Sequence, residues 1–103
     1  MKTSKITFIG AGNMATSLIS GLIADGYDPK MLTASDPDSE KLAQLTARCG
    51  IHSATDNHQA VADADVVVLA VKPQVMESVA RDLASAIIKR KPLVISIAAG
   101  VQE

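Results

Sequence analysis

Short apolar runs alternate with stretches of helical periodicity along this chain, and this alternation limits the possible folds more than any other feature. The predicted strands are Ile6–Ile9, Met31–Ser35, Ile51–Ser53, Asp65–Val71 and Leu93–Ile97. Between them, apolar residues recur every three or four positions. The rows are Met14, Leu18 and Leu22 beside Ala15, Ile19 and Ile23, then Leu42, Leu45 and Cys49, and last Val75, Val79, Leu83 and Ile87, which we expect to form a core row. Strands that alternate with helices form a parallel sheet through right-handed crossovers. The sequence therefore predicts an α/β fold, a doubly wound parallel sheet with helices on both faces.

Short polar residues mark where two of the predicted helices begin. Asp38 or Ser39 is expected to cap the second helix, because either side chain can accept a hydrogen bond from the first turn. Thr55 or Asp56 is expected to cap a short helix at Asn57–Ala62 in the same way.

The composition agrees with one domain that covers residues 1–103. Hydrophobic residues make up 48% of the chain and aromatic residues only 2%, as expected for strands of small and branched residues that are buried on both faces. A net charge of -1 offers no basic surface to nucleic acid. No apolar run approaches the roughly 20 residues that span a bilayer, and the N-terminus does not read as a signal peptide. We therefore expect a cytoplasmic protein that binds neither nucleic acid nor membrane.

A glycine-rich turn joins the first predicted strand to the first predicted helix. It reads Gly10-Ala11-Gly12-Asn13-Met14-Ala15, a G-x-G-x-x-A element in the context that a dinucleotide-binding turn requires. Gly10 permits the tight turn, Gly12 has no Cβ to block a diphosphate, and the N–H groups that open the helix attract anions. The turn favours a Rossmann-type site, with strand order 3-2-1-4-5 and a ligand crevice between strands one and four. A glycine turn that merely joins a strand to a helix is the competing interpretation.

The residues that end the second predicted strand, Ser35 and Asp36, bear on the choice of cofactor. A carboxylate at this position accepts hydrogen bonds from both ribose hydroxyls and repels a 2′-phosphate, which favours NADH over NADPH. Alternatively, Asp36 only begins the turn at Pro37 or caps the next helix. Lys41, one helical turn further on, could reach a 2′-phosphate, and Ser35 could donate to one. NADPH or NADH therefore both stay open, and Asp36 favours NADH.

The chain contains no pattern typical of a catalytic or metal-binding site. His52 and His58 lack a paired carboxylate at a telling spacing, while Asp63 and Asp65 flank a strand start and are typical of solvated turns. Cys49 is the only cysteine and falls on an apolar helix face. We expect no catalytic residue and no metal site among these residues.

Four segments together resemble the N-terminal domain of the pyrroline-5-carboxylate reductases, which reduce 1-pyrroline-5-carboxylate to L-proline. They are Phe8–Met14, Asn57, Ala70–Pro73 and Ser96–Val101. The first is shared with many dehydrogenases, whereas Ala-Val-Lys-Pro and Ser-Ile-Ala-Ala-Gly-Val are much more specific. The resemblance covers the whole chain and implies the NAD(P)H-binding domain of an oxidoreductase of proline biosynthesis.

The resemblance also implies which residues hold the cofactor. The diphosphate would be bound by Ile9, Gly10, Ala11, Gly12, Asn13 and Met14. The adenosine side would be contacted by Ser35, Asp36 and Asn57. The nicotinamide half would be lined by Ala70, Val71, Lys72 and Pro73 and by Ala98, Ala99 and Gly100. Both of these last loops leave the carboxyl ends of strands beside the switch point, where ligands bind in such sheets. For Lys72, a solvated side chain is an equally good interpretation.

Two departures from the family pattern limit what the resemblance implies. Many members carry an arginine after the second strand that suits the 2′-phosphate of NADPH, and this chain has Asp36 and Pro37 there. The family also has a second, helical domain that forms the dimer and supplies most of the imino-acid site. We therefore expect a truncated chain, inactive alone, whose substrate and homo-oligomer belong to the full-length protein. A reductase of the β-hydroxyacid dehydrogenase type and a non-catalytic dinucleotide-sensing module are the alternative functions.

Overall fold

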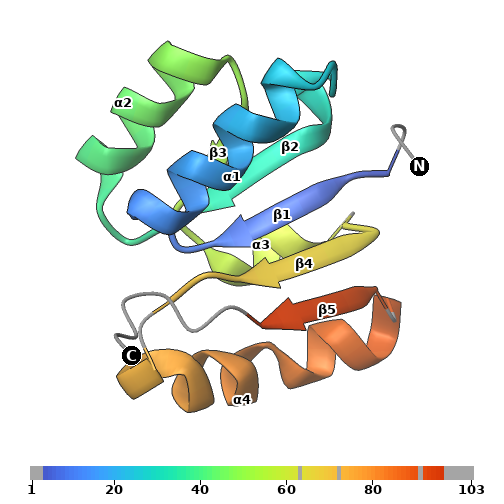
Figure 1. The fold of residues 1–103 in the computed structure, drawn as a ribbon. Helices are drawn as coiled ribbons and strands as arrows, with labels where there is room; N and C mark the ends of the chain where they lie inside the picture. Colours follow the sequence, from blue (N-terminus) through green and yellow to red (C-terminus); the bar gives the residue numbers. More distant parts are fainter. Residues whose placement is uncertain (1–3, 63, 72, 91, 97–103) are drawn as a thin grey trace, which may run out of the picture.

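The computed structural model describes residues 4–62, 64–71, 73–90 and 92–96. In this part of the chain, strands and helices alternate as predicted (Figure 1). The strands are β1 (Ile6–Ile9), β2 (Leu32–Ser35), β3 (His52–Ala54), β4 (Val66–Leu69) and β5 (Leu93–Ser96). The helices are α1 (Asn13–Ala24), α2 (Ser39–Cys49), α3 (Asn57–Val61) and α4 (Pro73–Arg90), with a 3-10 turn η1 (Pro29–Met31) before β2. None of these helices combines the length and apolar character needed to cross a bilayer.

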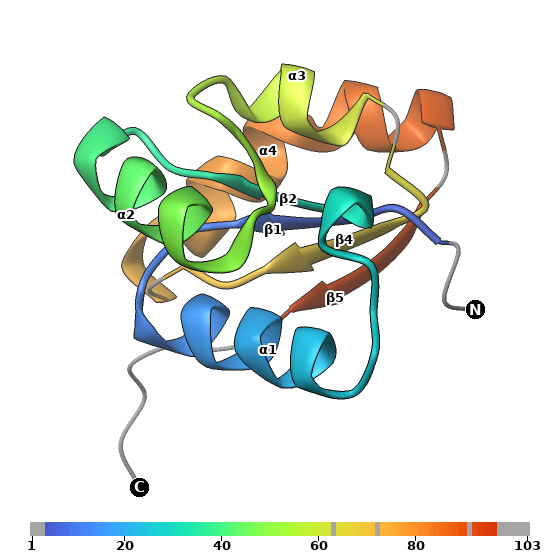
Figure 2. The same cartoon turned by 90° about the horizontal axis from the view of Figure 1, so that it is seen from above.

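The sheet is parallel throughout and has the order β3-β2-β1-β4-β5, which confirms the predicted topology. Two apolar cores lie on its two faces, since successive residues of a strand point to opposite sides. Phe8 and its partners Ala34 and Val68 pack under α1 and α2, whereas Ile9 and Leu69 pack under α3 and α4. Figure 2 shows α1 on one side of the sheet and α3 and α4 on the other. The predicted α/β sheet with helices on both faces is thus confirmed.

The element boundaries differ from the predictions by one or two residues, for identifiable reasons. Met31 belongs to η1 rather than to the second strand, because the Asp28 carboxylate accepts a hydrogen bond from the Lys30 N–H at 2.9 Å and starts a turn there. The third strand is His52–Ala54 rather than Ile51–Ser53. Asp65 and the residues after Leu69 lie outside β4.

The structure also decides which residues cap α2 and α3. Asp38, not Ser39, caps α2, and its carboxylate accepts hydrogen bonds from the N–H groups of Glu40 and Lys41. Asp56, not Thr55, caps α3 through the N–H of His58. In both cases an aspartate outcompetes a neighbouring hydroxyl residue, and each cap fixes where its helix starts.

The predicted apolar rows are only partly buried. On α1, Ala15 and Ile19 are fully buried, whereas Met14 and Leu18 are more than a third exposed. On α4, Leu83 is buried, but Val75 is 44% exposed, so the prediction that Val75 belongs to the core is wrong. The side chain of Ile87 lies outside the described residues. Periodicity places residues on one helix face, but it does not reveal how far the sheet extends beneath that face.

Gly10 sets the path of the chain from β1 into α1. Its φ is +107°, a conformation that L side chains rarely adopt, and a Cβ on it would lie 2.5 Å from the carbonyl oxygen of Ala70. Its N–H donates to the Ser35 carbonyl oxygen at 2.6 Å, and the Ala70 N–H donates to that of Ile9 at 2.9 Å. The ends of β1, β2 and β4 are therefore joined at this glycine.

We predict that Gly10→Ala lowers the free energy of unfolding by at least about 2 kcal/mol, because it adds backbone strain to a backbone clash. The control is Gly21→Ala in the middle of α1, where an added Cβ meets nothing within 4 Å. Its free energy of unfolding should rise by up to about 1 kcal/mol. Urea denaturation of both variants measures the difference. Equal stabilities for the two variants would show that the turn tolerates a side chain.

Candidate functional site

A cleft of about 580 Å³ opens at the carboxyl ends of β1 and β4, where the strand order reverses. It is lined by Gly10, Gly12, Asn13, Met14, Ser17, Asp36, Pro37, Lys41, Ala70, Val71 and Val75. Ligands of doubly wound sheets bind in this location. The cleft brings together seven of the predicted cofactor-binding residues, from the turn after β1, the end of β2 and the exit of β4.

The backbone N–H groups at the start of α1 lie at this cleft and have no hydrogen-bond partner among the described residues. Gly12 is the N-cap residue, and no side chain of the described residues caps the helix. A Cβ on Gly12 would meet nothing within 4 Å, and its φ of -80° suits any residue. The glycine at this position therefore leaves open space in front of the helix, whereas Gly10 provides the unusual backbone conformation.

Two of the predicted loop donors are already used within the protein. The Gly10 N–H is bound to Ser35, and the Ala11 N–H donates to Oδ2 of Asp36 at 2.9 Å. The donors left for an anion are consequently the N–H groups of Gly12 and of the first turn of α1. Ile9 is only 1% exposed, so its side chain belongs to the core and only its backbone lies near the cleft.

Asp36 combines the two interpretations that its sequence position allowed. Its Oδ1 accepts a hydrogen bond from the Asp38 N–H at 2.8 Å, which makes it a turn residue. Its Oδ2 is tied to the turn after β1, and the residue lines the cleft. The cap of α2 is Asp38 instead. Two backbone N–H groups thus hold the Asp36 carboxylate at the wall of the cleft, which Lys41 also lines.

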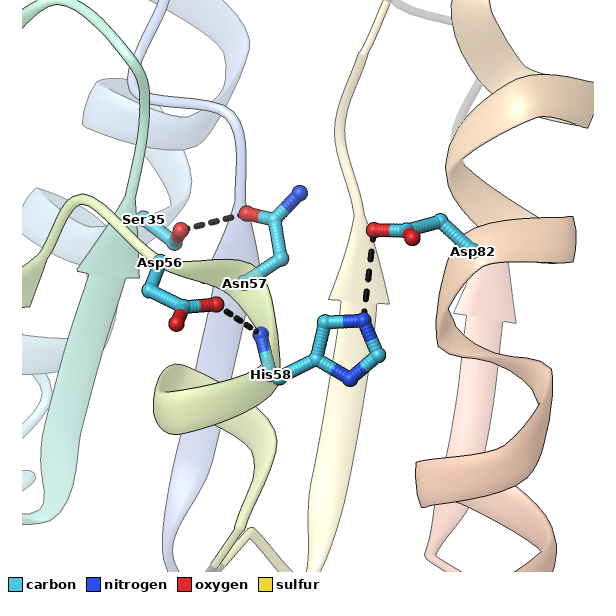
Figure 3. A network of polar contacts seen from close by, with 5 residues as sticks. All are labelled: Ser35, Asp56, Asn57, His58 and Asp82. Carbon is cyan, nitrogen blue, oxygen red and sulfur yellow. Dashed lines mark hydrogen bonds and ion pairs between the residues drawn. The ribbon is translucent and has the colours of Figure 1, made fainter.

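A polar network that the sequence did not predict joins the end of β2 to α3 and α4 (Figure 3). Ser35 is fully buried, and its hydroxyl donates to Oδ1 of Asn57 at 2.5 Å. His58 Nε2 lies 3.4 Å from the Asp82 carboxylate of α4, with both side chains about half exposed. The predicted adenosine contacts Ser35 and Asn57 therefore bond to each other.

A second cleft, of about 560 Å³, lies between the start of α1 and α2. It shares Gly12, Asn13 and Lys41 with the first cleft and is otherwise lined by Ala11, Thr16, Gln44, Leu45 and Arg48. Lys41 was predicted from the sequence as a possible contact, whereas Arg48 was not. The available signal was the spacing of residues 41, 44, 45 and 48, which places all four on one face of α2.

A smaller cleft of about 290 Å³ near the amino ends of the strands contains none of the predicted site residues. Lys72 and Ala98–Gly100 lie outside the described residues, and of Pro73 only its place at the start of α4 is described. Their predicted contacts with the nicotinamide half stay predictions.

Comparison with known proteins agrees with this architecture. The model of the family described as "NADP oxidoreductase coenzyme F420-dependent" matches residues 5–100. A pyrroline-5-carboxylate reductase of Pseudomonas aeruginosa is 52% identical over 101 residues, which cover 98% of this chain and 37% of that protein. The Escherichia coli enzyme of the same name is 40% identical, over 94% of this chain and 36% of that protein. The chain thus spans little more than a third of these relatives.

Solved structures give the same result. A pyrroline-5-carboxylate reductase from Coxiella burnetii superposes with a TM-score of 0.90 at 47% identity, over 97% of this chain and 37% of that one. The Plasmodium falciparum pyrroline carboxylate reductase, solved with NADP bound, shares the fold with a TM-score of 0.79 at 23% identity, over 94% of this chain and 34% of that one. The predicted resemblance to pyrroline-5-carboxylate reductases is confirmed. By its match to the family model, the chain belongs to the NADP oxidoreductase coenzyme F420-dependent family.

Proposed function

We propose that this chain is the NAD(P)H-binding part of a pyrroline-5-carboxylate reductase. The observation that carries the proposal is the uncapped start of α1, where Gly12 leaves open space beside the cleft at the switch point. A dianionic diphosphate matches both the free N–H groups and the positive end of the helix dipole. The names of the relatives support the choice of 1-pyrroline-5-carboxylate as substrate, and its reduction would give L-proline.

The residues of the cleft fit each part of a dinucleotide. Gly12 and the first turn of α1 would hold the diphosphate, and Asp36 would accept hydrogen bonds from the adenosine ribose. Ala70 and Val71, at the exit of β4, would line the nicotinamide half through their backbone and small side chains. When bound, the reduced nicotinamide would supply the hydride that reduces the C=N bond of the imino acid. The protein's own contribution here is to bind and orient the cofactor.

The imino-acid site would come from residues outside this chain. The relatives are more than twice as long as the part that matches. On the face of the sheet that α1 covers, Leu93 and Ile95 of β5 are 62% and 42% exposed, and Met14 and Leu18 of α1 are also exposed. This apolar surface supports a further packed layer in the longer protein. The helical domain and the homo-oligomer of the full-length enzyme stay part of the proposal, as does the cytoplasmic location.

We expect this chain to bind NADH or NADPH and not to oxidise either when 1-pyrroline-5-carboxylate is present. Calorimetric titration measures the first, and the absorbance of the reduced nicotinamide measures the second. The absence of binding by a folded chain would overturn the proposed function. Robust turnover would show instead that the substrate site lies within these residues.

Gly12→Val should lower the affinity for the cofactor at least tenfold, or about 1.4 kcal/mol, because its branched side chain fills the space in front of the helix. The fold should survive, since the φ of -80° at Gly12 suits valine. Calorimetry gives the affinity, and circular dichroism verifies the fold. Unchanged affinity in a folded variant would mean that the diphosphate does not lie against this turn.

We propose further that Asp36 favours NADH. A 2′-phosphate beside its carboxylate would add repulsion, about 1 kcal/mol in water for two unit charges about 4 Å apart. Asp36→Ser should therefore raise the affinity for NADPH relative to NADH. The loss of the bond to Ala11 should weaken both cofactors alike, so the ratio of the two dissociation constants is the quantity to measure.

Asp38→Ser is the matched control for this prediction. It removes the same charge two residues away, outside the cleft, and serine can replace aspartate as the cap of α2. Its NADH/NADPH ratio should equal that of the wild type at one salt concentration. If Asp36→Ser also leaves the ratio unchanged, Asp36 serves only the turn and the preference for NADH is wrong.

A further inference from the structure

Ser35 lies in a position from which it cannot contact a ligand directly. It is the last residue of β2, its side chain is 0% exposed, and its carbonyl oxygen accepts the hydrogen bond from the Gly10 N–H. The hydroxyl donates to Asn57 Oδ1. A buried hydroxyl that is left without an acceptor costs about 1 to 3 kcal/mol, so breaking this bond without a replacement would be unfavourable.

The bond decides which way the Asn57 amide faces. The oxygen and nitrogen ends of the amide have almost the same shape, and only a hydrogen-bond partner distinguishes them. In the structure the amide oxygen faces Ser35 and accepts the hydrogen bond from its hydroxyl. The NH2 group then points away from Ser35, as Figure 3 shows.

The backbone of Asn57 is fixed independently of its side chain. The Asp56 carboxylate caps α3 through the N–H of His58 at 2.9 Å, and the His58 side chain reaches Asp82 of α4. Asn57 is thus held between two anchored residues. With its amide oriented by Ser35, its NH2 group is a fixed donor near the end of β2, the strand that is followed directly by Asp36.

We propose that Ser35 is a positioning residue for the cofactor, which orients the Asn57 amide so that its NH2 group donates to an oxygen atom of the adenosine half. This rests on the proposed function. It replaces a direct contact of Ser35 with the ribose by an indirect role. Without the hydroxyl, the amide can turn over and present its oxygen to an oxygen of the ligand, which loses the hydrogen bond.

A double-mutant cycle tests the proposal. The cofactor to use is whichever of NADH and NADPH binds the wild type more tightly. Ser35→Ala should raise its dissociation constant about three- to tenfold, the range of one net hydrogen bond. Asn57→Ala should raise it at least as much. In the Asn57→Ala background, Ser35→Ala should have no further effect on the dissociation constant. Urea denaturation of each variant verifies that binding is measured on folded protein.

Two results would overturn the proposal while leaving the proposed function intact. One is a Ser35→Ala variant that binds as tightly as a wild type that does bind the cofactor. The other is the same loss of affinity from Ser35→Ala in both backgrounds, which would mean that Ser35 acts through the fold and not through the amide. A wild type that binds neither cofactor would instead overturn the proposed function itself.

Discussion

The close approach of Gly10 to the Ala70 carbonyl is the constraint on which the rest of the structure depends. No side chain fits between the two backbones, so the strand β1 can lie beside the exit of β4 only if the turn residue is glycine. The hydrogen bonds from Gly10 to Ser35 and from Ala70 to Ile9 join three strand ends at this point. The direction of α1 and the position of Asp36 follow from it, and Gly10 and Ala70 themselves line the cleft of about 580 Å³.

At this edge, groups of opposite hydrogen-bonding character succeed one another. The start of α1 offers donors and Asp36 offers acceptors, and in the proposal above the Asn57 amide, held by Ser35, offers a donor again. A dinucleotide has the complementary sequence of a diphosphate, ribose hydroxyls and further oxygen atoms. Because Asp36 is held by two backbone N–H groups, its position is fixed before any ligand arrives, and such preorganisation reduces the entropy lost on binding.

The fold and the core of the site could be predicted because their signals are local. The run of β-branched residues in β4 and the glycines after β1 report strand burial and turn geometry directly, and these predictions gave the correct sheet order. The bond between Ser35 and Asn57 could not be predicted, since it joins residues 22 positions apart in sequence that meet only when β2 and α3 are assembled. The exposure of Val75 was missed because a row of apolar residues on a helix does not show where the sheet beneath it ends.

The last strand has a physical consequence for handling the protein. Among the described residues, β5 pairs only with β4, so its outer row of backbone N–H and C=O groups has no neighbouring strand. Leu93–Ser96 carries no charge, and Leu93, Val94 and Ile95 are exposed. An uncharged, apolar edge of this kind is a template for edge-to-edge pairing between molecules. Self-association of the chain at high concentration should therefore begin at β5, at the side of the sheet away from β3.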